Sequence, residues 1–238
     1  MSIRSTRFAV VAAVAATAAL VLAGCAPEPT PSSSPTVSAQ AESPSPSAPS
    51  AEPSIADVDR ISLSVSSFTL YAGETQVAAL STDDATIDTT IDALTEALGE
   101  PQVETASDEP SECAVPNVTY SWGDALRVLD YTEGPGFDTA TIRFLAATVP
   151  SASGADVALE GGSGITVGDD IATLIEDTPS TDKDSYEVDG ESFFTVLLER
   201  DDRIEDSTGG LWGLGAATEG STVTVIGAPM NVHSGVDC

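Results

Sequence analysis

The stretch "IDTTIDALTEALGEP", residues 87–101, predicts an amphipathic helix. Its apolar residues recur at spacings of four, three and four, which places them on one helical face. Asp83, Asp84 and Thr86 offer capping and first-turn groups, and Gly99 followed by Pro101 ends the helix. The four residues on the apolar face are Ile87, Ile91, Leu94 and Leu98.

A second stretch, "VGDDIATLIEDTP" at residues 167–179, repeats this pattern eighty residues later. Val167, Ile171 and Leu174 recur at spacings of four and three, and Pro179 follows them. We therefore expect a second helix, related to the first as in an internal repeat.

Short apolar or alternating segments follow each expected helix and predict strands. Before the first helix, "ISLSVSSFTLY" (residues 61–71) alternates and then changes phase, which favours one strand with a β-bulge at Ser66–Ser67. The sequence thus predicts an α+β fold: two tandem repeats of a helix packed on an antiparallel sheet, residues 55–150 and 151–238. The expected strands after the helices are residues 118–122, 125–131, 139–145, 192–199, 211–217 and 221–228.

Residues 1–24 have the three parts of an export signal: basic Arg4 and Arg7, an apolar segment, and a small-residue end. The sequence Leu22-Ala23-Gly24-Cys25 resembles the lipobox of bacterial lipoproteins in every position. This resemblance implies that the signal is removed and that Cys25 becomes a diacylated N-terminus, anchored in the cell membrane on its extracytoplasmic face. Two acyl chains hold a protein stably, whereas one holds it marginally. The alternative is an ordinary secretion signal with a chance cysteine.

Residues 25–54 form an expected linker between this anchor and the folded part. Residues 26–54 contain eight of the fifteen prolines, and most of the others are Ser, Ala, Thr and Glu. Such a segment buries too little apolar surface to offset its conformational entropy, so we expect a disordered, partly polyproline-II spacer.

The charge of the chain is strongly acidic, with eight Lys and Arg against 38 Asp and Glu. This balance makes nucleic acid and anionic lipid surfaces poor partners for the body of the protein. Solubility accounts for such a charge, and attraction of a basic partner or of divalent cations is the sharper alternative.

Two cysteines remain beyond Cys25, and one histidine is present. We expect Cys113 and Cys238 to form a disulfide, because an exported protein lies in an oxidising setting. A redox role is the alternative, but the sequence contains no Cys-x-x-Cys pair. His233 lies beside the C-terminal cysteine, and we do not expect it to be catalytic. With these residues alone, we expect no zinc or iron site.

A set of structural residues recurs along the chain: Leu98-Gly99-Glu100-Pro101, Cys113, Trp122, Gly164 with Gly168, and Gly235 with Cys238. This pattern resembles that of a fold found in secreted and lipid-anchored actinobacterial proteins. The resemblance implies the tandem helix-plus-sheet fold of the β-lactamase inhibitor protein, which is related to small outer-membrane assembly lipoproteins. It implies no contact residues for this chain.

Candidate binding chemistry is sparse in the sequence. The segments "TDKDSYEVDGE" and "ERDDRIED" could give oxygen ligands to a weak calcium site, but their spacing departs from the twelve-residue calcium loop. Trp122 beside strand segments suggests core packing, whereas Trp212 in "GGLWGLG" is a candidate exposed binding contact.

These observations predict a lipid-anchored, non-enzymatic cell-surface module without a cofactor, which binds a protein or another envelope component. One alternative is a cell-wall-active enzyme that uses two of the many carboxylates. The other is a carrier of a small ligand or lipid, which would need an apolar pocket.

Overall fold

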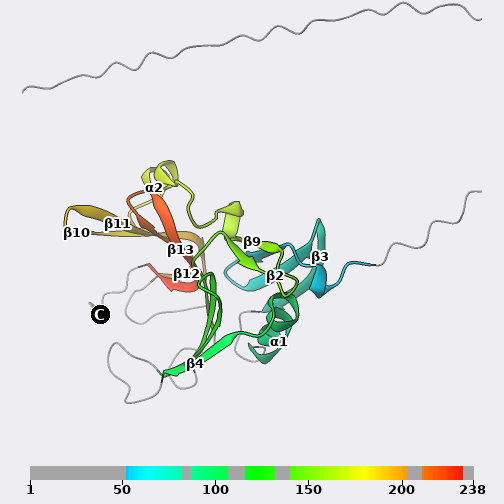
Figure 1. Ribbon diagram of the computed structural model, residues 1–238. Coiled ribbons are helices and arrows are strands. Elements are labelled where there is room, and N and C mark those ends of the chain that lie inside the picture. The colour runs from blue at the N-terminus through cyan, green and yellow to red at the C-terminus, as the bar shows by residue number, and fades with distance from the viewer. Residues whose placement is uncertain (1–51, 82–86, 107–115, 132–139, 203–210, 233–238) are drawn as a thin grey trace, which may run out of the picture. The chain divides into compact units, whose positions relative to one another are not determined.

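The computed structural model describes residues 52–81, 87–106, 116–131, 140–202 and 211–232, all of which belong to the unit that spans residues 50–238 (Figure 1). Of these described residues, 53% lie in strands and 16% in helices. The predicted α+β fold of two tandem helix-on-sheet repeats is therefore wrong: the described part of the chain is mostly β and consists of two sheets with a shared core.

The smaller sheet has five strands in the order β3-β2-β1-β9-β8. Neighbouring strands are antiparallel except for β1 and β9, which pair in parallel although about a hundred residues separate them. The strands are β1 (Arg60–Leu63), β2 (Ser67–Ala72), β3 (Thr75–Ser81), β8 (Thr148–Pro150) and β9 (Asp156–Glu160).

The larger sheet has eight antiparallel strands in the order β10-β11-β12-β13-β7-β6-β5-β4. It joins strands from before and after residue 150, because β13 pairs with β7. Because of this long-range pairing and that of β1 with β9, each sheet contains strands from both of the expected repeats. The strands are β4 (Gln102–Ala106), β5 (Asn117–Trp122), β6 (Leu126–Asp130), β7 (Thr141–Phe144), β10 (Lys183–Val188), β11 (Glu191–Arg200), β12 (Trp212–Glu219) and β13 (Thr222–Asn231).

The first expected helix is confirmed as α1 (Ile87–Leu98). Leu94 and Leu98 are buried, and Gly99 follows with a φ of 87°, a conformation that favours glycine after a helix. The second is only the six-residue α2 (Ala172–Asp177), which begins after Val167 and Ile171. The helix predicted from the spacing of apolar residues is therefore longer than the helix that forms. Two short 3-10 turns, η1 (Ile55–Asp57) and η3 (Gly162–Gly164), complete the described helical elements.

The expected bulge at Ser66–Ser67 is also wrong, because the chain reverses direction there. Strands β1 and β2 form a hairpin in which Leu63 lies opposite Phe68. The Ser64 hydroxyl accepts a hydrogen bond from the Ser67 N–H at 3.1 Å, which stabilises the turn. Since residues directly opposite each other in a hairpin face the same side, the turn explains the change of phase.

Side chains from both sheets and from α1 form one buried cluster. Phe68 of the smaller sheet and Phe144 of the larger one meet at its centre, with ring centroids 6.3 Å apart and planes inclined by 57°. Trp122 is buried as predicted, and its indole N–H donates to the Gly99 carbonyl oxygen at 2.7 Å, which links β5 to the end of α1. One face of the larger sheet is therefore committed to the core.

Candidate functional site

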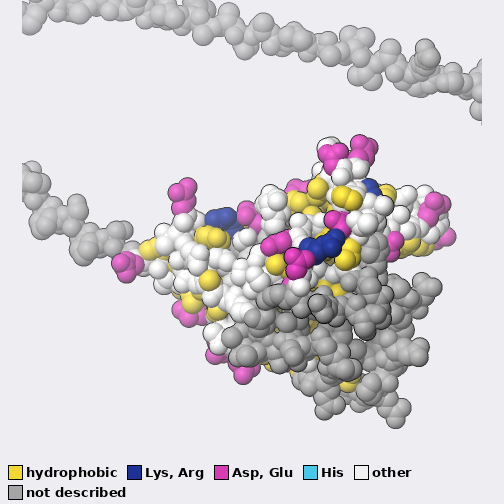
Figure 2. All heavy atoms as spheres, turned by 180° about the vertical axis from the view of Figure 1, so that it is seen from behind, with side chains coloured by type: hydrophobic (Ala, Val, Ile, Leu, Met, Phe, Trp, Pro, Cys, Tyr) yellow, Lys and Arg dark blue, Asp and Glu magenta, His cyan; other side chains and the backbone are white. Residues whose placement is uncertain are grey.

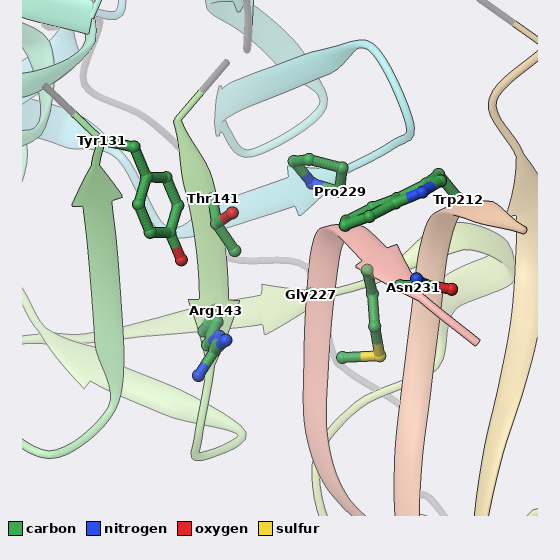
Figure 3. Close-up of a pocket in the computed structure, with 8 residues that line it drawn as sticks. Tyr131, Thr141, Arg143, Trp212, Gly227, Pro229 and Asn231 are labelled. Atoms are coloured by element: carbon green, nitrogen blue, oxygen red, sulfur yellow. The ribbon is translucent and has the colours of Figure 1, made fainter. Parts of the chain in front are cut away.

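A cavity of about 290 Å³ lies on the other face of the larger sheet, over strands β7, β12 and β13. In Figure 3, Tyr131, Thr141 and Arg143 lie on one side of this group, and Trp212, Pro229 and Asn231 lie on the other. The site therefore collects residues from segments that are far apart in the sequence. The described residues that line it are Tyr131, Thr141, Arg143, Trp212, Gly227, Pro229, Met230 and Asn231.

A β-bulge shapes the β13 side of this cavity. Gly213 lies opposite Met230 and Gly215 lies opposite Gly227, so two residues of β13 face the single Leu214 of β12. Pro229 occupies the bulge, where a missing backbone N–H is tolerated. Bulges of this kind redirect side chains and are common beside functional sites.

Two paired glycines let Met230 lie close to the sheet. A Cβ atom at Gly215 would come 2.8 Å from the Met230 Sδ, and one at Gly227 would come 3.2 Å from its Cε. Larger residues would fill the space that Met230 and the cavity share. Because neither glycine has a side chain, the middle of these two strands leaves a hollow that the Met230 side chain lines.

The lining combines apolar and polar groups. Trp212 and Tyr131 are half-buried aromatic residues, and both engage other groups of the chain. Thr141 is buried, whereas the Arg143 side chain is exposed. A mainly apolar hollow with a few polar groups at its edge is the usual composition of a small-molecule site.

Arg143 has a second arginine directly opposite it. Arg127 of β6 pairs with Arg143 of β7 in the sheet register, and both side chains are exposed on the face that carries the cavity. Neither guanidinium makes a hydrogen bond or an ion pair in the described part of the chain. Two like charges directly opposite each other destabilise a sheet, so this pair is unfavourable without a counter-ion.

The other described basic residues have partners. Arg60 forms an ion pair with Glu160 at 3.4 Å and lies 4.1 Å from the centre of the Tyr71 ring. Arg200 pairs with Asp182 at 2.5 Å, and the Lys183 ammonium donates to the Ile175 carbonyl oxygen. On the face seen in Figure 2, basic side chains form small separate patches among acidic ones. The two arginines beside the cavity therefore stand apart from the other described cations.

The residues predicted from the sequence are placed unevenly. Trp212 lies in the cavity wall, while the other predicted residues fall outside the part of the chain that the structure describes. Nothing described bears on the lipid at Cys25 or on the expected disulfide. The residues singled out from the sequence that lie outside the described ranges are Cys25, Cys113, Cys238 and His233.

The first acidic segment proposed for calcium, residues 181–191, contains strand β10 and the turn of the β10–β11 hairpin, and the second, residues 199–206, is described only as far as residue 202. Asp189 and Gly190 have φ values of 53° and 87°, and they form the two-residue turn between Val188 and Glu191. Asp-Gly is a typical sequence for such turns. In the described ranges, no three His, Cys, Asp or Glu side chains gather as metal ligands.

Three residues elsewhere in the described chain have a shifted pKa. Burial is the main cause that raises the pKa of Tyr120, with Asp130 and Asp88 adding to it. Hydrogen bonds from Ser54 lower the pKa of Asp57, and hydrogen bonds from Ala172 and Ser221 lower that of Asp170. These three residues do not line the cavity.

Sequence reasoning missed the arginine pair, although a signal for it was present. Arg127 and Arg143 each occupy a polar position between apolar residues of an expected strand, in a chain with very few cations. Their pairing across β6 and β7 was not readable from that pattern.

Comparisons with known proteins give no family for this chain: no family model, curated protein or solved structure matches it. Within the described ranges, no helix has the length and apolar character needed to cross a membrane.

Proposed function

We propose that the protein is a lipid-anchored binding module of the cell surface, and that the cavity on the larger sheet is its ligand site. The observation that carries the proposal is the cavity itself, which lies where a bulge and two glycines meet on strands β12 and β13. Trp212, the binding contact predicted from the sequence, lies in its wall. Aromatic side chains give large contact areas in binding sites, so this position supports the proposal.

A capture experiment tests the binding role. The full chain with Cys25→Ser, which removes the proposed lipid site, is immobilised and exposed to native envelope extracts. We expect a component that is retained by this chain and lost with the additional change Trp212→Ala. Tyr186→Ala is the matched control, because Tyr186 is an aromatic residue of edge strand β10 that is 59% exposed and does not line the cavity. Equal capture by all three chains, or no capture, contradicts the proposed site.

The anchor has a separate test. Cells that express the full chain are grown with labelled palmitate and then fractionated. We expect label and protein together in the membrane fraction, and we expect both to be lost from it with Cys25→Ala. A Cys25→Ala chain that stays in the membrane fraction contradicts lipid anchoring, and this outcome leaves the cavity proposal unaffected.

A small-ligand carrier is the second candidate, favoured by the size of the cavity. At about 290 Å³, it is just under the range of about 300–1,000 Å³ that is usual for small-molecule sites, so it suits a compact ligand. A carrier would retain its ligand during purification, so native mass spectrometry of the full chain would show a bound mass that Trp212→Ala removes.

A further inference from the structure

We propose that Arg127 and Arg143 form the anion-recognising part of the cavity, and that the ligand carries a carboxylate on a compact apolar group. This inference rests on the proposed ligand site and adds the chemistry of the ligand. It joins two observations: an opposed pair of guanidinium groups for which the described residues provide no hydrogen bond or ion pair, and an apolar hollow that one of them lines.

The arginine pair supplies the charge for this recognition. Opposed residues of an antiparallel pair have Cβ atoms about 4.5–5.5 Å apart, so both guanidinium groups can reach one anion. An anion between them would replace repulsion by two attractive contacts. Guanidinium groups bind carboxylates through two parallel hydrogen bonds, and these charge-assisted bonds are stronger than neutral ones.

The cavity supplies the selection for an apolar group. Trp212, Pro229 and Met230 present mainly apolar surface next to Arg143. A buried cavity of about 150 Å³ is enough for benzene, so the volume here of about 290 Å³ holds a ring with a short side chain. A bare inorganic anion would use the arginines and leave this surface in contact with water.

In so acidic a chain, binding of an anionic ligand depends on a local concentration of cations such as the arginine pair. A net charge of −30 repels anions at long range, so a ligand with a carboxylate is bound only where cations are concentrated. Arg127 and Arg143 are exposed, and salt therefore screens their attraction for the ligand. We expect binding of the carboxylate to weaken as the salt concentration rises.

Matched small probes test this inference with the full Cys25→Ser chain. The first pair is 3-phenylpropionate and its neutral amide, 3-phenylpropionamide, followed by titration calorimetry and by tryptophan fluorescence. We expect the acid to bind with a dissociation constant of about 1 mM, as is usual for so small a ligand. It should bind about tenfold or more tightly than the amide, in line with the strength of charge-assisted hydrogen bonds.

Variants locate the effect. Arg143→Gln should weaken binding of 3-phenylpropionate about tenfold, and Arg127→Gln should weaken it by a similar or smaller factor. Arg60→Gln is the matched control, because it removes the same charge from β1, where Arg60 already pairs with Glu160. It should change the affinity by less than about twofold. Circular dichroism and urea unfolding of each variant show whether it is folded.

Two further probes ask whether the carboxylate belongs to a peptide C-terminus or a free acid, and whether the site prefers phosphate. N-acetyl-phenylalanine has the chemistry of a peptide C-terminus, so its tighter binding relative to 3-phenylpropionate would assign the carboxylate to a peptide end, and weaker binding would assign it to a free acid. Inorganic phosphate should bind more weakly than either. Tighter binding of phosphate overturns the choice of carboxylate.

The outcomes also separate this inference from the proposed function. Equal binding of the acid and the amide, with loss of both in Trp212→Ala, overturns the arginine role and leaves the cavity as a binding site. Binding of neither probe overturns the carboxylate ligand, and the envelope capture then decides the cavity on its own. Equal weakening by Arg60→Gln and Arg143→Gln shows an effect of net charge and overturns the paired site.

Discussion

The two faces of strands β6 and β7 carry side chains of opposite character. Toward the core, Val128, Ile142 and Phe144 are fully buried and apolar. On the other face, Arg127 and Arg143 are exposed and opposed in the same two strands. Successive residues of a strand point to opposite faces, so one short sequence can serve both stability and recognition. Stability and binding should therefore respond to different substitutions in these strands.

The largest expected effect comes from the core face. Phe144→Ala removes a ring at the contact between the sheets and leaves a cavity, so we expect a loss of about 3–5 kcal/mol in the free energy of unfolding. The neighbouring change Arg143→Gln should alter that free energy by less than about 0.5 kcal/mol. Urea unfolding of both variants measures the contrast. Similar losses in the two would break the assignment of the faces.

The two tryptophans differ in the same way, because Trp122 is buried in the core and Trp212 lines the cavity. Trp122→Phe removes the donor to the Gly99 carbonyl oxygen and should cost about 1–3 kcal/mol of unfolding free energy. Trp212→Phe keeps a ring in the cavity wall and should cost less than about 1 kcal/mol, while it weakens binding of the phenyl probe. Urea unfolding and calorimetry separate the effects. A greater loss of stability in Trp212→Phe would contradict this division.

A substitution at the opposed arginines should raise the unfolding free energy, by less than the losses expected above. Arg127→Glu replaces a like-charge pair by an opposite-charge pair, so we expect a gain of about 0.2–1 kcal/mol in unfolding free energy. The gain should shrink as salt is added, and binding of 3-phenylpropionate should be lost. Arg127→Gln is the neutral control and should lie between the wild type and Arg127→Glu. A less stable Arg127→Glu would show that repulsion is absent.

The sequence predicted those parts of the fold whose signals are local. The spacing of Ile87, Ile91, Leu94 and Leu98 and the Gly99 stop lie within one segment, and α1 is confirmed. The same reasoning made α2 too long, because Val167 and Ile171 pack against the core from outside a helix.

Pairing between distant strands could not be predicted in this way. The β1–β9 and β7–β13 contacts depend on residues about a hundred and about eighty positions apart, and a local pattern does not encode them. The change of phase before Phe68 was visible, yet a bulge and a serine turn both explain it, and only the pairing partner distinguishes them.

The candidate site could be predicted only in part for the same reason. Trp212 stood out because glycines flank it in the sequence. The rest of the cavity depends on the bulge at Pro229 and on the alignment of Gly215 with Gly227, which exist only after β12 and β13 have paired. The two arginines become a pair only when β6 and β7 align.

The smallest expected effect lies beside the first residue of β13, where Asp170 forms a β-bridge with Thr222. Hydrogen bonds from the Ala172 N–H, at 3.0 Å, and from the Ser221 side chain hold the pKa of Asp170 below its ordinary value of 3.8. A carboxylate with a lowered pKa in the folded state stabilises the protein above the pKa of the unfolded state. That contribution is lost as the pH falls through the lower, folded-state pKa.

Asp170→Asn should therefore destabilise the protein slightly at neutral pH, and the difference from the wild type should vanish below the folded-state pKa. Urea unfolding between about pH 2 and 7 follows the difference. Asp156→Asn, at an exposed position of β9, removes the same charge and controls for the net charge of the chain. If only general repulsion acted in so acidic a protein, removing either charge would stabilise it at neutral pH. A loss of unfolding free energy in Asp170→Asn with a gain in Asp156→Asn therefore identifies the Asp170 hydrogen bonds. Changes of the same sign in both variants contradict them.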